Sequence, residues 1–167
     1  QIETITADNA RLVSNIHANL GGLYRMNSYP DLAREHMEKS ISLLDQFNLL
    51  HINDSIPQIA NYAMFLTEQQ EPERCISELQ KLSGIIKEYH SDDCLDYAKV
   101  QETLGTIYLM TANLPQAKTH FKRAFKIYEK IWADEPEMIE AKYQEIQELY
   151  PQIGFCIGKN LSGLLKK

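Results

Sequence analysis

Apolar and small residues recur along most of this chain at the three-to-four-residue spacing of amphipathic helices. The pattern begins with a helix over about residues 8–26, and a partner helix follows Pro30, since the first turn of a helix tolerates proline. The apolar positions of the first helix are Leu12, Ile16, Leu20 and Leu23. A third helix pair is predicted to open at the cap sequence Ser91-Asp92-Asp93, and a last helix spans 136–149.

The helix pairs follow one another at a fixed interval. Three small residues that each follow a turn proline, Ala33, Cys75 and Ala117, lie 42 residues apart. The same shift superposes Gly21 on Ala63 and Gly105, and Met37 on Leu79 and Phe121. A constant period near this length is typical of stacked helical repeats.

The sequence therefore predicts an all-α fold, a right-handed superhelical array of antiparallel helix pairs (an α-solenoid). Residues 1–167 are expected to form a single array with about three repeats, at approximately 8–50, 51–90 and 91–133, and a C-terminal capping region at 134–167. Within helices, Gly21 and Gly105 each cost about 1 kcal/mol relative to alanine, so we expect close approach of the partner helix at these two positions.

The columns of small and bulky residues resemble those of a known repeat family. The segment LGTIYLMTANLPQAKTHFKRAF, residues 104–125, resembles a tetratricopeptide repeat, and residues 19–40 match with milder substitutions. The resemblance covers roughly residues 8–133. Because the common period of this family is about 34 residues, the longer period is similar to that of the kinesin-light-chain type. The resemblance implies a protein-interaction module.

Composition narrows the function further. The formal charge of −6 and the dispersed lysines disfavour a nucleic-acid surface, and no segment is apolar enough to span a membrane. Three scattered cysteines, Cys75, Cys94 and Cys156, favour a reducing, cytoplasmic setting over a disulfide framework. Because the first residue is Gln1, we expect the chain to be part of a longer protein.

Catalytic and cofactor signatures are not recognisable. Residues 154–160, GFCIGKN, differ from a phosphate-binding loop in spacing and in the final residue. The five histidines do not follow metal-ligand spacing, and Cys75 occupies a small-residue core column. We therefore expect a protein that is not an enzyme, with no metal and no cofactor.

The resemblance also implies a binding site. Tetratricopeptide domains of this type use asparagine, one position before the Leu column of the first helix, to hydrogen-bond the backbone of a peptide in a concave groove. Asn19 and Asn61 match this pattern, and Thr103 departs from it. The other candidate groove residues are Asn15, Gly22, Arg25, Met64, Lys99, Glu102 and Thr106. The alternative is that these are ordinary polar residues on an exposed helix face.

The leading hypothesis is a module that binds a peptide segment of a partner protein, with Arg25 and Lys99 favouring an acidic ligand. One alternative is a regulatory peptide-sensing domain of a larger protein, such as a transcription regulator. Another is a structural scaffold that forms a homodimer through the apolar segment Ile153 to Leu165.

Overall fold

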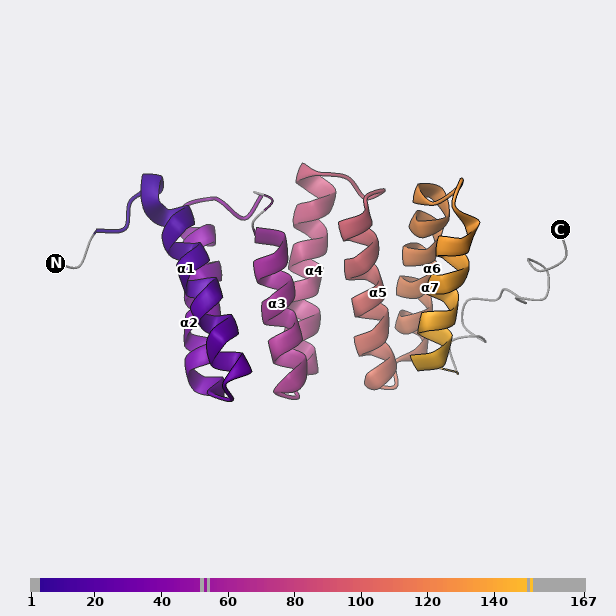
Figure 1. Cartoon of the computed structure of the whole chain (residues 1–167), viewed down its shortest axis with the longest axis horizontal. Coiled ribbons are helices and arrows are strands. Elements are labelled where there is room, and N and C mark those ends of the chain that lie inside the picture. The colour runs from indigo at the N-terminus through magenta and orange to yellow at the C-terminus, as the bar shows by residue number, and fades with distance from the viewer. Residues whose placement is uncertain (1–3, 52, 54, 150, 152–167) are drawn as a thin grey trace, which may run out of the picture. The chain divides into compact units, whose positions relative to one another are not determined.

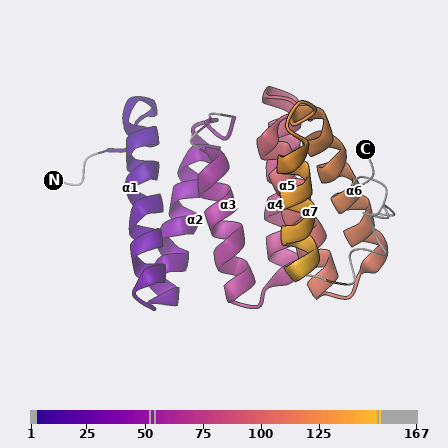
Figure 2. The same ribbon diagram turned by 45° about the vertical axis from the view of Figure 1, so that its right-hand side comes forward.

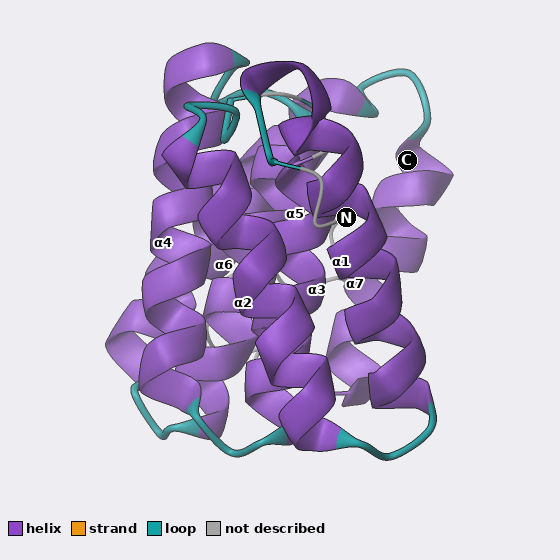
Figure 3. Cartoon of the chain, turned by 90° about the vertical axis from the view of Figure 1, so that its left-hand side faces the viewer, coloured by secondary structure: helices purple, strands orange, loops and turns teal. Residues whose placement is uncertain are grey.

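The computed structural model describes residues 4–51, 53, 55–149 and 151. Seven α-helices and no strand are present in this part of the chain (Figures 1 and 3). The helices are α1 (Ala7–Met26), α2 (Pro30–Gln46), α3 (Ser55–Glu68), α4 (Pro72–Tyr89), α5 (Leu95–Met110), α6 (Leu114–Ile131) and α7 (Pro136–Leu149). The predicted all-α architecture of paired helices is confirmed.

The chain divides into two compact units, the first ending at His90 and the second beginning at Ser91. In the first unit α1 packs against α2, α2 against α3 and α3 against α4, and Figure 2 shows α1, α2 and α3 one after another. In the second unit α5 packs against α6, and α6 contacts α7. One continuous superhelix over both units stays a prediction.

One predicted boundary is wrong. The helix expected to be capped by Ser91-Asp92-Asp93 begins only at Leu95, and Cys94 is its N-cap residue. The Cys94 backbone is extended, and its Sγ accepts a hydrogen bond from the Tyr97 backbone N–H at 3.5 Å. The Ser91 hydroxyl instead accepts from the backbone N–H of Asp93, which makes a local turn ahead of the helix.

The turns inside the helix pairs repeat with the same 42-residue period. Ser28, Gln70 and Ala112 adopt φ of 62°, 61° and 59°, the left-handed conformation that usually takes glycine. At the third turn the backbone N–H of Ala112 donates to the Leu109 carbonyl and that of Asn113 to the Tyr108 carbonyl, at 3.0 and 2.7 Å. This is a Schellman arrangement, and it reverses the chain within three residues.

The close helix approach predicted at two glycines is confirmed. A Cβ on Gly21 would lie 2.6 Å from Met37 Cγ and 3.2 Å from the Ala33 carbonyl oxygen. A Cβ on Gly105 would lie 2.9 Å from the Phe121 ring. Neither site has room for a methyl group, so glycine is what lets the helices of each pair pack at this distance.

The apolar positions of α1 are largely uncovered. Leu12, Ile16 and Leu23 are 63%, 48% and 55% exposed, whereas Ala10, Ser14 and Gly21 are the buried residues of this helix. The residue one period after Leu23 is Phe65, which is 1% exposed and lies under the Arg34 guanidinium, 5.2 Å from its ring centroid. The periodicity correctly predicted a helix here, but the apolar face of α1 is not covered by another described helix.

Two histidines meet where α1 packs on α2. The Nδ1 atoms of His17 and His36 lie 2.8 Å apart, and Tyr24 stacks on His36. In the third repeat His120 occupies the equivalent place, and its Nδ1 faces Gln101 Oε1 at 2.8 Å. Burial and the neighbouring His36 lower the pKa of His17 below its ordinary 6.5.

Candidate functional site

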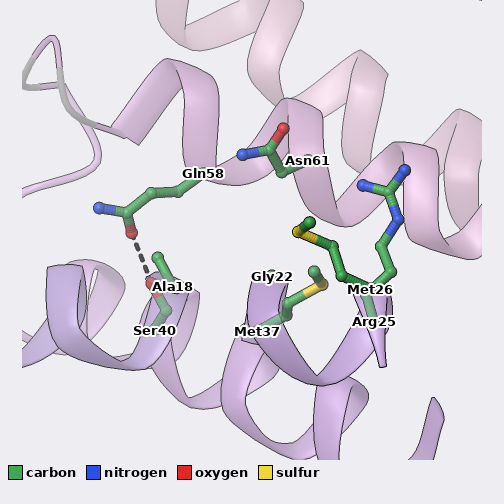
Figure 4. A pocket seen from close by; sticks show the side chains of 8 residues that line it. All are labelled: Ala18, Gly22, Arg25, Met26, Met37, Ser40, Gln58 and Asn61. Atoms are coloured by element: carbon green, nitrogen blue, oxygen red, sulfur yellow. Dashed lines mark hydrogen bonds between the residues drawn. The ribbon is translucent and has the colours of Figure 1, made fainter. Parts of the chain in front are cut away.

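A pocket of about 130 Å³ opens between α1, α2 and α3 (Figure 4). Its walls contain three of the predicted groove residues, Gly22, Arg25 and Asn61. The other lining residues are Ala18, Met26, Met37, Ser40 and Gln58. The pocket therefore combines apolar walls with amide groups and one guanidinium.

A buried polar network closes one end of this pocket. Gln58 Oε1 accepts hydrogen bonds from the hydroxyls of Ser14 and Ser40, and the Ser14 oxygen lies 2.9 Å away. The Gln58 amide donates to Asn15 Oδ1 at 2.6 Å. Asn15 is thus engaged in holding α3 against α1, and its side-chain oxygen is already used within the protein.

Arg25 lies at the other end and is paired. Its Nε and Nη2 atoms donate to the two carboxylate oxygens of Glu68 at 2.9 and 2.7 Å. A bidentate pair of this kind compensates the guanidinium charge. The attraction of Arg25 for an acidic ligand is therefore weaker than the sequence alone indicates.

The two asparagines of the predicted column occupy different surroundings. Both are exposed, but Asn61 lines the pocket and Asn19 does not. The reason is geometric, because Asn61 faces the helix pair that precedes its own. The pair before Asn61 is α1 and α2, and no described helix precedes Asn19.

Of the two predicted apolar groove residues, Gly22 lines the pocket and Met64 does not. Met64 is 51% exposed and is not a lining residue of the pocket. At Gly22 a Cβ would meet no atom within 4 Å, so this glycine is not required by packing. It leaves open space at the pocket wall.

The remaining candidates lie on α5 in the second unit. Glu102 accepts a hydrogen bond from the Tyr128 hydroxyl at 2.6 Å and pairs with Lys142 at 3.0 Å. The Thr103 hydroxyl donates to the Lys99 carbonyl at 2.9 Å, and Thr106 is partly buried. Thr103 thus uses its donor on its own helix.

A second pocket, of about 260 Å³, lies between α5, α6 and α7. It includes one predicted residue, Lys99, together with residues that sequence reasoning missed: Leu95, Tyr128, Trp132, Met138, Ala141, Lys142 and Glu145. Continuing the asparagine column by one more period from Thr103 leads to Glu145. This shift is the sequence signal that could have placed a residue of α7 at the pocket.

Among the described residues no cluster of three or more His, Cys, Asp or Glu side chains is arranged to hold a metal ion. None of the described helices is long and apolar enough to cross a membrane. Cys75 is buried and Cys94 is partly buried, and both are free thiols. Residues 154–160, which were compared with a phosphate-binding loop, and the apolar segment 153–165 lie outside the described residues.

Comparison with known proteins identifies the repeats. Residues 55–130 match the family described as tetratricopeptide repeat. The chain contains a tetratricopeptide repeat domain. The crystal structure of BtubC (BKLC) from P. vanneervenii is similar, with a TM-score of 0.69 and 19% sequence identity over 78% of this chain and 50% of that chain. The chain thus spans about half the length of that protein. A search of curated proteins found no match.

The predicted family is confirmed, and the similar solved structure shows the same fold at 19% sequence identity. Tetratricopeptide repeats are generally protein-interaction modules and form a non-catalytic scaffold family. Such domains typically bind protein partners.

Proposed function

We propose that this tetratricopeptide repeat domain is a non-enzymatic module that binds an extended peptide segment of a partner protein along α1 and α3. The observation that carries the proposal is the side chain of Asn61. Its amide is exposed at the α1–α3 pocket, and no hydrogen bond engages it within the described part of the chain. An amide offers two donors and an acceptor, which suits the alternating groups of a peptide backbone.

The surroundings of Asn61 support the same function. Gly22 has open space where a side chain would be, so a peptide backbone has room to approach α1 (Figure 4). The volume of about 130 Å³ admits one side chain of moderate size. Because Arg25 is paired with Glu68, we propose a ligand held here by its backbone and one apolar side chain rather than by a carboxylate.

Affinity capture from a lysate of the source cells tests the proposal with four forms of the domain. The native form and Asn19→Ala should capture the same partner, because Asn19 does not line the pocket. Asn61→Ala should weaken capture, and Gly22→Leu should block it while keeping the helix intact, since leucine is a better helix former than glycine. Circular dichroism verifies folding of each form.

Equal capture by the native form and by Gly22→Leu would contradict a peptide site in this pocket. Loss of the same partner with Asn19→Ala, at unchanged helicity, would move the site to the outer face of α1. A regulatory peptide-sensing domain of a larger protein would use the same groove, and a partner that is a short signalling peptide would favour that alternative.

A structural scaffold is a second candidate, favoured by the uncovered apolar residues Leu12, Ile16 and Leu23 on α1. Sedimentation equilibrium over a range of concentrations tests it. A mass that rises with concentration in the native chain and stays monomeric in Leu23→Glu would support self-association through α1. The earlier expectation of a homodimer through residues 153–165 concerns residues outside those described.

A further inference from the structure

Two imidazole rings meet where α1 and α2 pack most closely. Gly21 allows this close approach, and His17 lies one turn before it on the same face of α1. On α2, His36 directly precedes Met37, the residue that a Cβ on Gly21 would meet. The Nδ1 atoms of His17 and His36 lie 2.8 Å apart. Both histidines are partly exposed, so the pair can be reached from solvent.

The third repeat builds the same arrangement with one change. His120 takes the place of His36, and its Nδ1 lies 2.8 Å from Oε1 of Gln101. In both repeats a tyrosine, Tyr24 or Tyr108, stacks on the histidine with the ring centroids 5.3 Å apart. The helix pair and the stacked ring therefore orient the histidine in the same way in both places. Only the side chain opposite its Nδ1 differs.

The spacing of the two Nδ1 atoms matches a pair of metal ligands at a right angle. At a metal–nitrogen distance of about 2.0–2.1 Å, two ligands at a right angle have their nitrogens about 2.8–3.0 Å apart, and two tetrahedral ligands about 3.3–3.4 Å. The 2.8 Å between the nitrogens of His17 and His36 agrees with the first value. Right angles between neighbouring ligands are found in the square-planar and tetragonal sites that copper(II) and nickel(II) prefer.

The protonation of the pair also suits a metal ion. Burial, His36 and Lys39 lower the pKa of His17, and Glu35 raises it, so the His17 ring is neutral at pH 7.5. One Nδ1 of the pair donates a hydrogen to the other. When the donating ring takes its other tautomer, with the hydrogen on Nε2, both Nδ1 lone pairs become free, and no proton has to leave the protein.

We propose that His17 and His36 form a two-histidine site for a divalent transition metal ion, nickel or copper, with the two Nδ1 atoms bound at a right angle. No third His, Cys, Asp or Glu joins the pair in the described part of the chain, so water occupies the remaining positions on the ion. Spacing along the sequence does not indicate this site, because the two ligands come from different helices. The site does not depend on peptide binding.

Isothermal titration calorimetry with Ni²⁺ tests the site on the untagged chain, in a buffer at pH 7.5 that does not bind metal. Nickel is the probe because copper(II) oxidises free thiols, and Cys75 and Cys94 are free. The native chain should bind one Ni²⁺ ion in a saturable titration. Its urea midpoint should also rise with the nickel concentration, since the two ligands are brought together only in the folded state.

The third repeat supplies matched variants. His17→Gln copies the pair that Gln101 and His120 already form, so the fold should persist, and circular dichroism verifies this. The variant should weaken nickel binding at least about tenfold, since even the loss of an outer-shell partner costs about 10–100-fold in metal affinity. Gln101→His makes the reverse change and should add a second site of similar affinity. His120→Gln should leave the native site unchanged.

The absence of saturable nickel binding in the native chain would overturn the site. Equal affinity of the native chain and His17→Gln would place the ion on other groups and would overturn it as well. If Gln101→His bound no second ion, the geometry of the helix pair would not be what positions the two nitrogens. None of these results bears on the α1–α3 pocket, which is decided separately by the capture experiment with Asn61→Ala.

Discussion

Adding a methyl group to glycines of the first unit should change stability in opposite directions. Gly21 and Gly84 both lie inside helices, α1 and α4, so each substitution by alanine gains about 1 kcal/mol of helix propensity. At Gly84 a Cβ meets nothing within 4 Å. Gly84→Ala should therefore raise the free energy of unfolding by about 1 kcal/mol.

At Gly21 the same gain is opposed by a clash. The new Cβ would lie 2.6 Å from Met37 Cγ, and the flexible side chain of Met37 has room to yield only in part. The Ala33 carbonyl oxygen and the Met37 backbone nitrogen, both at 3.2 Å, cannot move without shifting α2. Overpacking of this kind costs about 1–3 kcal/mol. Gly21→Ala should thus lower stability by up to about 2 kcal/mol after the propensity gain.

Urea unfolding followed by far-UV circular dichroism measures both variants. Gly22→Ala is the matched control, because it lies next to Gly21 on the same helix and has open space around its Cβ. It should be as stabilising as Gly84→Ala. If Gly21→Ala were equally stabilising, the close approach of α1 and α2 would not be the reason for that glycine.

Three further predictions concern the turns, the core and pH. Ala112→Gly should stabilise the second unit by about 0.5–1 kcal/mol in urea unfolding, because glycine relieves the left-handed strain at φ 59°. This net value is smaller than the strain itself, since glycine also increases the conformational entropy of the unfolded chain. Phe65→Ala should lower the free energy of unfolding by about 3–5 kcal/mol and Leu23→Ala by less than about 1 kcal/mol, because only Phe65 is buried. The two residues occupy the same position of the repeat, so equal losses of stability would show that α1 is covered in solution. The lowered pKa of His17 means that the folded state binds this proton less readily than the unfolded chain, so its contribution to stability is complete above pH 6.5 and declines as pH falls below that value. The urea midpoint measured at neutral and mildly acidic pH should fall less in His17→Gln than in the native chain, and an equal fall would exclude the pair with His36 as the cause.

Helix positions and the repeat period were predictable because they depend on local patterns. Pro30 inside a first turn and the spacing of apolar residues place a helix with little help from the rest of the fold. The close approach at Gly21 could be predicted from the low helix propensity of glycine, since a glycine inside a helix is unfavourable unless packing requires it. Gly22 and Gly84 show the limit of that argument, because neither is required by a close neighbour.

The turn conformations and the start of α5 were harder to predict. The left-handed position of each helix pair is occupied by Ser28, Gln70 or Ala112, and none is the glycine that marks this conformation in sequences. The hydrogen bonds of the turn and the packing of the pair impose it. Similarly, a cysteine is a weak N-cap, and the stronger cap residues Ser91 and Asp92 lie too early because the chain makes a further turn before α5.

The column of groove residues shows why a repeat is not a complete site. Asn19 and Asn61 occupy the same position of the period, yet only Asn61 lines a pocket, because the opposite wall comes from the repeat before it. At the same position of the later repeats, the Thr103 hydroxyl donates to a carbonyl of its own helix, and Glu145 forms an ion pair with Lys142. Identity of position therefore fixes the direction in which a side chain points, while the preceding helix pair decides whether a cavity is there. The junctions between repeats therefore decide the chemistry of such an array, and the residues that line the α1–α3 pocket differ from those that line the α5–α7 pocket.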